Sequence, residues 1–224
     1  GIMKMVNFSM NLYGQMQPAI GLMSMAVHPF HKKKGIAQEM MTYYETYTME
    51  MGGLVAILLP FRFGFYRKLG YGLGARMDEY HLETKNLPAD GQMNSLVKLE
   101  SKDLKRMLDC YEEIVEQNHG MLMKFSEEIW DMEQDESTLR VGYESDGKLK
   151  GYMAYHFEEA SSVNYTLNTL VVDELVYEDG QVLKSFLTYL YRQGDLAQTV
   201  LLRSGEEDFY HLLMDPQHSS FYSI

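Results

Sequence analysis

Residues 26–37, with the sequence AVHPFHKKKGIA, combine the groups that bind phosphate. Lys32, Lys33 and Lys34 supply positive charge, and Gly35 lets an anion approach the backbone closely. A helix that begins at this glycine leaves its first backbone N–H groups without internal partners, and its dipole adds partial positive charge at the same end. We therefore predict that this segment holds a phosphate group. The alternative interpretation is a solvated run of charge at a helix start.

Two elements flank this segment and would position it. Residues 20–27 are mostly apolar, as in a buried strand, and Pro29 then ends the pairing because proline has no N–H to donate. After the lysines, five residues fall at helical spacing: Ile36, Met40, Met41, Tyr44 and Thr48. The spacing excludes two other phosphate loops, since the chain has neither Gly-x-x-x-x-Gly-Lys-Ser/Thr nor a Gly-x-Gly-x-x-Gly that opens a helix after a strand.

A second apolar run follows the predicted helix. Residues 54–59 are continuously apolar and are followed by Pro60, which predicts a central strand buried on both faces. The next residues, 61–72, have the sequence FRFGFYRKLGYG. A short helix there would turn Phe65, Tyr66 and Leu69 inward, and Gly70 would end it.

The order strand, phosphate turn, helix, strand and then Phe-Tyr-x-x-x-Gly-Tyr resembles the core of the GNAT acetyltransferases. Their pyrophosphate loop, Arg/Gln-x-x-Gly-x-Gly/Ala, corresponds here to Lys32-x-x-Gly35-x-Ala37. The chain resembles in particular the enhanced intracellular survival (Eis) family, whose first domain carries a His-Arg-Arg-Arg-Gly loop and a Tyr-Gly-Arg-Phe-Gly-Tyr-Gly segment at the same separation. The correspondence runs without a gap from about Leu22 to Tyr71.

The resemblance implies a fold class and a set of residues that contact acetyl-CoA. The fold is α/β (α+β), with two tandem GNAT acyl-CoA N-acyltransferase-like domains, each a mixed central sheet flanked by helices. One strand backbone would pair with the pantetheine arm, the turn would hold the pyrophosphate, and two residues after the second strand would add contacts. The implied cofactor-binding residues are Met25, Ala26, Val27, Lys32, Lys33, Lys34, Gly35, Ile36, Ala37, Gln38, Phe61 and Arg62.

The resemblance places the general acid of the family at Tyr66. An amine that attacks the acetyl thioester expels a thiolate, and a thiol has a pKa of ~8.5 against ~10 for a phenol, so a phenol protonates the sulfur only when it is held in contact with it. The backbone N–H of Val27 is the predicted donor to the oxyanion. We expect no metal site, because His28 and His31 lack further ligands at a useful spacing.

Composition and charge narrow the class of protein. A length of 224 residues suffices for one or two domains. The chain has no apolar stretch of membrane-spanning length and no signal-peptide core, and its one cysteine, Cys110, excludes an internal disulfide. The net charge of −12 argues against nucleic acid and favours a cationic amine substrate. We therefore expect a cytoplasmic protein with no nucleic-acid or membrane partner.

The chain is predicted to divide near residue 88. Residues 1–86 would form the C-terminal part of a first, cofactor-binding GNAT domain, residues 87–91 a linker, and residues 92–224 a second, degenerate GNAT-like domain. In the first domain we expect a strand at 4–13, a turn at 14–18 and a closing strand at 75–84.

The second domain repeats the order of strands and helices. We expect strands at 96–99, 139–143, 149–157, 165–177 and 199–203, a hairpin turn at 145–148, and helices from Ser101 to 118, from Ser126, at 180–192 and at 206–214. The turn at 177–180, with the sequence YEDG, is acidic where the first domain is basic. Two carboxylates there would repel a pyrophosphate, so the second domain is predicted not to bind CoA.

The resemblance also defines elements that this chain lacks. Family members begin with a strand and two helices before the strand that opens this chain, so the first domain is expected to be truncated at its N-terminus. They end in a sterol-carrier-like domain whose terminal carboxylate is the proposed general base, and Ile224 is not assumed to replace it. The family forms hexamers, which implies a homo-oligomer.

The sequence thus predicts an acetyl-CoA-dependent N-acetyltransferase. It would transfer acetyl to a primary amine of an aminoglycoside, a polyamine-like molecule or a lysine, by direct attack in a ternary complex. Two alternatives stay open: a non-catalytic acyl-CoA-binding or regulatory module that keeps the GNAT-like fold, and a structural domain with a basic turn. The acceptor, the general base and the oligomeric state are not determined by the sequence.

Overall fold

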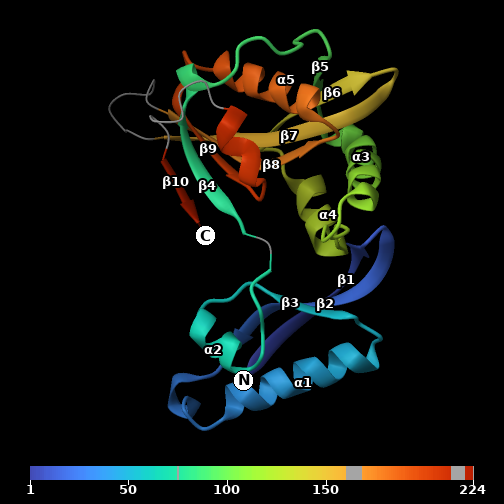
Figure 1. Cartoon of the computed structure of the whole chain (residues 1–224), viewed down its shortest axis with the longest axis vertical. Helices are drawn as coiled ribbons and strands as arrows, with labels where there is room; N and C mark the ends of the chain where they lie inside the picture. Colours follow the sequence, from blue (N-terminus) through green and yellow to red (C-terminus); the bar gives the residue numbers. More distant parts are fainter. Residues whose placement is uncertain (75, 160–167, 213–219, 224) are drawn as a thin grey trace. The chain divides into compact units, whose positions relative to one another are not determined.

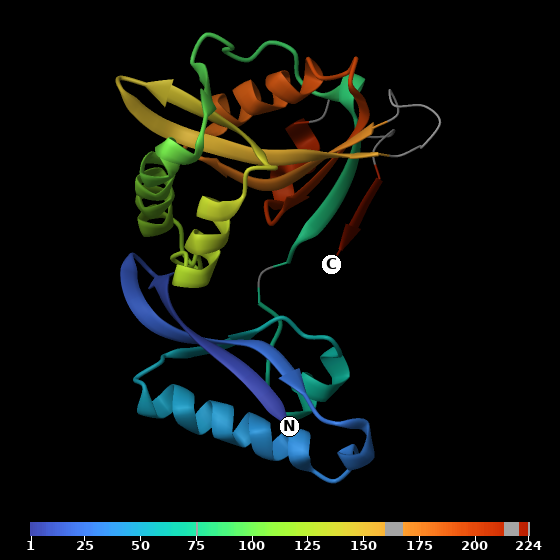
Figure 2. The same cartoon turned by 180° about the vertical axis from the view of Figure 1, so that it is seen from behind.

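The computed structural model describes residues 1–74, 76–159, 168–212 and 220–223. The chain forms two compact units, one of residues 1–72 and 115–132 and the other of residues 73–114 and 133–224. Each unit contains its own sheet (Figures 1 and 2).

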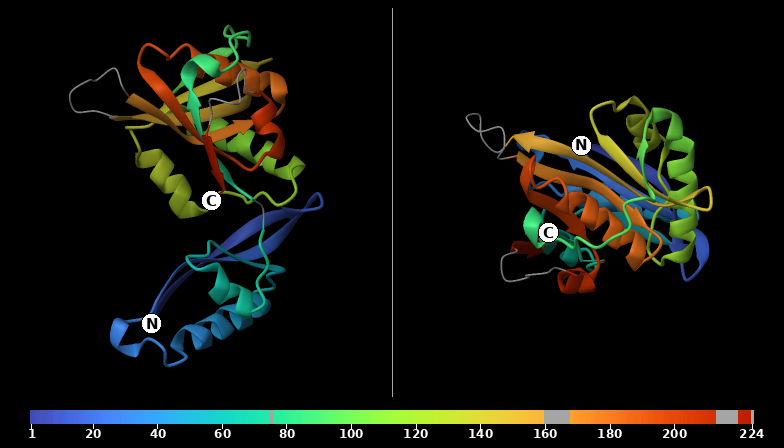
Figure 3. Two further views of the ribbon diagram at one scale, coloured as in Figure 1. Left: turned by 60° about the vertical axis from the view of Figure 1, so that its left-hand side comes forward. Right: turned by 90° about the horizontal axis from the view of Figure 1, so that it is seen from above.

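The first unit is built on a three-stranded sheet in the order β1-β2-β3. Strands β1 and β2 are antiparallel, and β2 and β3 are parallel. The long twisted hairpin of β1 and β2 is blue in Figure 3. Its elements are β1 (Ile2–Leu12), β2 (Gln15–Ala26), the 3₁₀ helix η1 (Pro29–His31), α1 (Ile36–Glu50), β3 (Val55–Leu58) and α2 (Phe63–Lys68).

Helix α1 lies along one face of this sheet and fixes the basic turn that precedes it (Figure 1). Met41 and Tyr44 are buried on its inner side and pack against Ile20 and Leu22 of β2 and Tyr66 of α2. On the opposite face, Phe8 meets Phe125 edge to face, with ring centroids 5.3 Å apart. The predicted strand, helix and short helix of this region are confirmed, and their packing joins the elements on the two sides of the turn.

The turn between β1 and β2 is shorter than predicted. It consists of Tyr13 and Gly14, with φ of 54° and 81°, and β2 already begins at Gln15 instead of after residue 18. Two left-handed residues give the turn a twist that matches a hairpin. The side-chain oxygen of Asn11 accepts a hydrogen bond from the Gly14 N–H at 2.8 Å, and this contact fixes the tight turn.

Strand β3 is not buried on both faces, contrary to the prediction. All four of its residues are half-buried, and Leu54 and Leu59 at its ends are 66% and 93% exposed. The physical reason is its place in the sheet, because within the described residues β3 pairs with β2 alone and forms an edge. An apolar run of strand length does not distinguish an edge strand from a central one.

The second unit contains a seven-stranded sheet in the order β10-β4-β9-β8-β7-β6-β5. Strands β8 and β9 are parallel and the other neighbours are antiparallel. Its strands are β4 (Asp78–Glu83), β5 (Leu96–Leu99), β6 (Leu139–Ser145), β7 (Lys148–Glu159), β8 (Asn168–Tyr177), β9 (Ala197–Ser204) and β10 (Ser220–Ser223). The helical elements are η2 (Thr84–Asn86), η3 (Ser101–Asp103), α3 (Leu104–Gln117), α4 (Ser126–Gln134), α5 (Gly180–Tyr191) and η4 (Glu207–Leu212), with the end of α3 and most of α4 belonging to the first unit.

Helix α5 covers one face of the large sheet (Figure 2). The hydrophobic core of the second unit lies between this helix and the sheet. Five apolar residues of the helix are almost fully buried there: Val182, Leu183, Phe186, Leu187 and Leu190. The predicted hairpin between β6 and β7 is confirmed, with Asp146 and Gly147 at φ of 53° and 75°. The unit β8-α5-β9 repeats the plan of β2-α1-β3, a parallel strand pair joined by one helix.

The strand predicted to close the first domain pairs in the second sheet instead. It is present as β4, with Asp78 opposite Ser204 and Glu83 opposite Thr199 of β9. Alternate residues of β4 are buried in the second core, including Tyr80 and Leu82. The alternating pattern predicts a half-buried strand but does not identify its partner. Residue 75, the first of the predicted strand, lies outside the described residues.

The segment predicted as a linker, residues 87–91, packs along α5. Leu87 is buried, the Thr188 hydroxyl donates to the Pro88 carbonyl at 3.0 Å, and it accepts from the Gly91 N–H at 2.9 Å. A Cβ on Gly91 would lie 2.6 Å from the Lys184 carbonyl oxygen, so glycine permits this close approach. The first boundary between the two compact units along the chain falls between residues 72 and 73, upstream of the segment.

Several predicted element ends are shifted in the structure. Ser101 and Ser126, the serines predicted to cap two helices, are instead the first residues of η3 and α4, and Glu100 caps η3 in a capping box with Asp103. The strand predicted from 165 is described from Asn168, and the helix predicted at 206–214 is a 3₁₀ helix at Glu207–Leu212; residues 165–167 and 213–214 lie outside the described residues. Strand β10 was not predicted.

Candidate functional site

Strands β2 and β3 part at the end that leads into the basic turn. Their parallel pairing ends at Leu22 opposite Leu58, whereas β2 continues to Ala26. Along these extra residues β1 still pairs with the other edge of β2, with Met3 opposite Met25. The edge of residues 23–26 that faces away from β1 therefore has no strand partner among the described residues. An extended ligand with amide groups can add to such an edge as a further strand.

Tyr44 of α1 joins the two strands close to the point where they part. Its hydroxyl, fully buried, lies 2.6 Å from the Ile20 carbonyl oxygen and 2.9 Å from that of Ile57. Burial raises the pKa of Tyr44 to about 12, so the phenol stays protonated and donates. The helical spacing predicted Tyr44 as a core residue, and the only signal for this further role is a hydroxyl on an otherwise apolar helix face.

The turn after β2 is a short, ordered 3₁₀ helix followed by two left-handed residues. Its hydrogen bonds run from the His31 N–H to the His28 carbonyl at 2.9 Å and from the Lys32 N–H to the Pro29 carbonyl at 3.3 Å. Lys33 then has φ of 62° and Gly35 has φ of 82°. Positive φ is uncommon for a residue with a side chain and often marks a functional site.

Helix α1 begins with free backbone donors. Gly35 at its N-cap has no side chain to cap the helix, and the first amides with a partner are those of Gln38 and Glu39, which both donate to the Gly35 carbonyl. Within the described part of the chain the N–H groups of residues 33–37 have no hydrogen-bond partner. Consecutive free amides at a helix start, beside left-handed residues, form a concave anion site.

The charge of the turn adds to these donors. Lys32, Lys33 and Lys34 are all exposed. In the parts of the chain that the structure describes, none of the three ammonium groups forms an ion pair with a carboxylate. The turn therefore offers both amides and uncompensated positive charge to an anion.

Tyr66 lies on α2, the short helix after β3, and is 5% exposed. Aromatic rings hold it edge to face, with centroids at 5.1 Å for Phe65, 5.7 Å for Phe61 and 6.1 Å for Tyr71. Burial raises its pKa, so the phenol remains protonated at neutral pH. Among the described residues the Tyr66 hydroxyl has no hydrogen-bond partner. It is not one of the fully buried hydroxyls without a partner, which belong to Tyr71 and Tyr152, so it is available to donate a proton.

The predicted site residues follow the carboxyl ends of the two parallel strands. Met25 and Ala26 end β2 and Val27 follows it directly, residues 32–38 form the turn and the start of α1, and Phe61, Arg62 and Tyr66 follow β3. In α/β sheets ligands bind beyond the carboxyl ends of parallel strands. The structure thus brings the predicted residues to one end of the first sheet. Arg62 is the N-cap of α2, and Phe61 is exposed.

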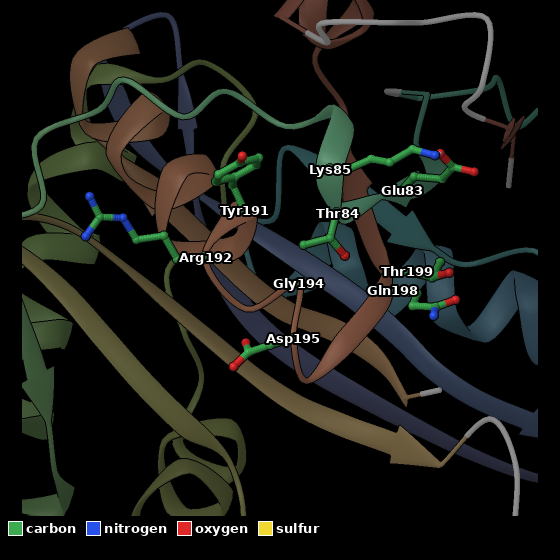
Figure 4. Close-up of a pocket in the computed structure, with 9 residues that line it drawn as sticks. All are labelled: Glu83, Thr84, Lys85, Tyr191, Arg192, Gly194, Asp195, Gln198 and Thr199. Atoms are coloured by element: carbon green, nitrogen blue, oxygen red, sulfur yellow. The ribbon is translucent and has the colours of Figure 1, made fainter. Parts of the chain in front are cut away.

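The second unit has a pocket at the C-terminal end of α5, whereas the candidate site of the first unit lies at the N-terminal end of α1 (Figure 4). The pocket has a volume of about 670 Å³ and lies beyond the carboxyl end of α5, between η2 and the start of β9. Figure 4 shows Lys85 turned toward Glu83, with which it forms an ion pair at 2.9 Å, and Arg192 turned aside. The charges around this pocket do not converge on one point. It is lined by Glu83, Thr84, Lys85, Tyr191, Arg192, Gly194, Asp195, Gln198 and Thr199.

The described residues contain neither a metal-binding cluster nor a membrane-spanning helix. No group of three or more His, Cys, Asp and Glu side chains is placed to hold a metal ion there. None of the described helices has both the length and the apolar character needed to cross a membrane.

Two family models match the chain, and both have the description acetyltransferase (GNAT) domain. The first matches residues 1–74 and the second residues 120–223. The chain therefore contains two tandem GNAT domains of mixed sheets and flanking helices. No curated protein sequence matches it.

Solved structures share this architecture at low sequence identity. A GCN5-related N-acetyltransferase from Anabaena variabilis has a TM-score of 0.84 and 17% identity, covering 98% of this chain and 56% of that one. A GCN5-related N-acetyltransferase from Kribbella flavida has a TM-score of 0.79 and 19% identity, and the match covers 99% of this chain and 55% of that one. Eis1 from Mycobacterium abscessus has a TM-score of 0.79 and 20% identity, and the match covers 98% of this chain and 58% of that one. The chain spans little more than half the length of these proteins, and the likeness concerns the fold.

Proposed function

We propose that this chain of two GNAT domains is an acetyl-CoA-dependent N-acetyltransferase of the Eis type. The proposal is carried by two features at one end of the first sheet: an edge of β2 and the amides at the start of α1, both without a partner among the described residues. CoA consists of an extended arm with amide groups that ends in a pyrophosphate. One feature suits each part of that molecule.

In this proposal the first domain binds the cofactor through its backbone. The pantetheine arm pairs with Met25, Ala26 and Val27, and the free amides of residues 33–37, at the turn that leads into Gln38, hold the pyrophosphate. Lys32, Lys33 and Lys34 add charge, acting as point charges without the bidentate fork of an arginine. Phe61 and Arg62 contact the cofactor from the end of β3.

The reaction is a direct transfer within a ternary complex. The neutral amine attacks the acetyl carbonyl carbon, and the Val27 N–H donates to the oxygen that becomes negative. The carbon–sulfur bond then breaks, and Tyr66 gives its phenol proton to the thiolate. The nitrogen of the product loses a proton, and the Tyr66 phenolate regains one from solvent. Burial raises the pKa of Tyr66, so the phenol keeps its proton until the carbon–sulfur bond breaks and the thiolate accepts it.

The proposed acceptor is a primary amine of a cationic molecule, such as an aminoglycoside, a polyamine or a lysine side chain. The net charge of −12 supports this class, because an acidic surface attracts cations. We further propose that the protein acts in the cytoplasm as a homo-oligomer, a hexamer on the resemblance to the Eis family.

Calorimetric titration of acetyl-CoA into the full chain tests the proposal, with Gly35→Glu as the variant. A glutamate at residue 35 adds a carboxylate at the anion site, and no atom lies within 4 Å of a Cβ there. Gly14→Glu is the matched control, since Gly14 has φ of 81° and the same open space at the other end of β2. Saturable binding that only Gly35→Glu abolishes would support the proposal. No binding by the folded chain would contradict it.

A further inference from the structure

Phe30 is a large apolar side chain that the fold presents to solvent beside the phosphate turn. It is 84% exposed, and it stands in the middle of η1, two residues before the first lysine. It is absent from the set of cofactor contacts that the sequence predicts. Single exposed apolar residues are common on protein surfaces, so it is the place of Phe30 beside the lysines and the amides at the start of α1 that makes it a candidate contact.

The backbone under Phe30 is held in place by its neighbours. Pro29 occupies the first position of η1 and fixes its φ, and the His28 side chain accepts a hydrogen bond from the Phe30 N–H at 3.4 Å. The His28 ring lies 5.2 Å from that of Phe30, tilted by 53°. The ring is therefore presented by an ordered turn.

The charge next to Phe30 indicates what kind of molecule would cover it. Lys32, Lys33 and Lys34 follow within four residues, and no ion pair neutralises them among the described residues. The free amides of residues 33–37 add further donors for anions. A matching ligand has a flat ring and more than one negative group, and a nucleotide with several phosphates has both.

We propose that Phe30 is the stacking platform for the adenine ring of the acyl-CoA, while the neighbouring lysines bind its ribose 3′-phosphate. The proposal rests on the function proposed above and extends it to the nucleotide end of the cofactor. Aromatic side chains bind nucleobases by stacking on their faces, because every base presents a flat π-face. Phe30 would then be a binding residue that takes no part in the acyl transfer.

The first test compares ligands that contain and lack the nucleotide. Phe30→Ala in the full chain is expected to weaken acetyl-CoA and adenosine 3′,5′-bisphosphate by about fivefold or more. The affinity for S-acetyl-pantetheine, which has no nucleotide, should not change. Tyr13→Ala is the matched control, because Tyr13 is an equally exposed aromatic residue, at 89%, in the turn at the far end of β2.

The second test gives a direct signal for stacking. Phe30→Trp keeps an aromatic face, and the chain has one other tryptophan, Trp130, whose fluorescence in the wild type gives the background. We expect adenosine 3′,5′-bisphosphate and acetyl-CoA to quench the new fluorescence, and S-acetyl-pantetheine to leave it unchanged.

The outcomes separate this proposal from the function on which it rests. Binding of acetyl-CoA by the wild type, with equal affinity in Phe30→Ala and no quenching in Phe30→Trp, would overturn the stacking platform alone. Absence of acetyl-CoA binding by the wild type would overturn both. Equal weakening of acetyl-CoA and S-acetyl-pantetheine by Phe30→Ala would show that the substitution disturbs the whole turn, which also contradicts the proposal.

Discussion

Helices α1 and α5 occupy the same place in two copies of one plan, yet their first turns are used in opposite ways. In both units a parallel strand pair is joined by the helix, and in both the longer strand runs past the last paired residue, from Leu22 to Ala26 in β2 and from Val172 to Tyr177 in β8. The opening between strands is thus common to both units and does not by itself define a cofactor site.

The difference lies in what meets the helix amides. At α5 the Asp179 side chain accepts from the N–H groups of Gln181 and Val182, both at 2.9 Å. At α1 Gly35 offers no side chain and the first amides stay free. A built-in carboxylate takes the place that a phosphate would take, with the same favourable interaction with the helix dipole. That the second domain does not bind CoA stays a prediction, and this contrast is its physical basis in the structure.

The largest expected effect comes from Tyr66, the proposed proton donor at the opening of the first unit. Tyr66→Phe should lower kcat by about 10²–10⁴-fold, because it removes the general acid and keeps the ring packing. Affinity for acetyl-CoA should remain. Steady-state kinetics and calorimetry on the same preparations measure both.

Tyr189→Phe in the second unit is the control for this experiment. It also removes a phenol hydroxyl, one that lies 2.7 Å from the Tyr155 hydroxyl, and it should leave kcat unchanged. If Tyr66→Phe turned over at the wild-type rate, Tyr66 would not be the acid. If the wild type bound acetyl-CoA and had no turnover with any amine, the alternative of a non-catalytic acyl-CoA-binding module would be favoured.

The second largest expected effect, on acetyl-CoA affinity, comes from giving α1 the aspartate N-cap that α5 has at Asp179. Gly35→Asp places a carboxylate at the N-cap, and aspartate tolerates the left-handed backbone better than most residues. Repulsion of like charges costs several kcal/mol, so acetyl-CoA should bind about 100-fold or more weakly. The asparagine of Gly35→Asn has the same shape as aspartate without the charge, so this variant should lose much less affinity for acetyl-CoA. Equal losses for the two variants would mean that shape, and not charge, decides between the two helices.

The two helices also differ in how their polar side chains are used. Tyr44 of α1 contacts carbonyls of both β2 and β3, whereas Thr188 of α5 contacts the segment at residues 87–91. Tyr44→Phe leaves two buried carbonyls without that donor and should lower the free energy of unfolding by about 1–3 kcal/mol. Urea denaturation measures this change.

The position of Tyr44 adds a second readout that separates the units. Since Tyr44 joins the strands at the cofactor opening, its loss should also weaken acetyl-CoA binding. Thr188→Val, which likewise removes a buried hydroxyl, should lower stability by a similar amount and leave binding unchanged. Equal binding by both variants would show that the strand junction does not shape the opening.

Local signals predicted most of the elements, and long-range pairing accounts for most of the differences. The hairpin at Asp146 and Gly147 and the helix after Gly35 depend on nearby residues, and both are present. The alternation in β4 is equally compatible with either sheet, and its partner β9 lies more than 100 residues away. Segment 87–91 has the composition of a linker, yet its glycine and proline serve a close packing that no local pattern reveals.

The candidate site shows the same division. The glycine and lysines of the turn are visible in the sequence because their residue types carry the chemistry. The left-handed Lys33, the strand contacts of Tyr44 and the exposure of Phe30 depend on the folded backbone. The predicted roles of Tyr66 and Val27 stay predictions, because they require a bound cofactor to define the reacting atoms.

The smallest expected effect concerns the cap of α5 itself. Asp179→Ala removes the acceptor for two amides, and loss of an N-cap costs about 1 kcal/mol of unfolding free energy. Asp179→Asn keeps an acceptor oxygen and should retain most of the stability. If Asp179 only stabilises its helix, neither variant should alter acetyl-CoA affinity or stoichiometry. A second equivalent of acetyl-CoA bound by Asp179→Ala would instead show that this carboxylate alone closes the second site, because the opening beside β8 is already present.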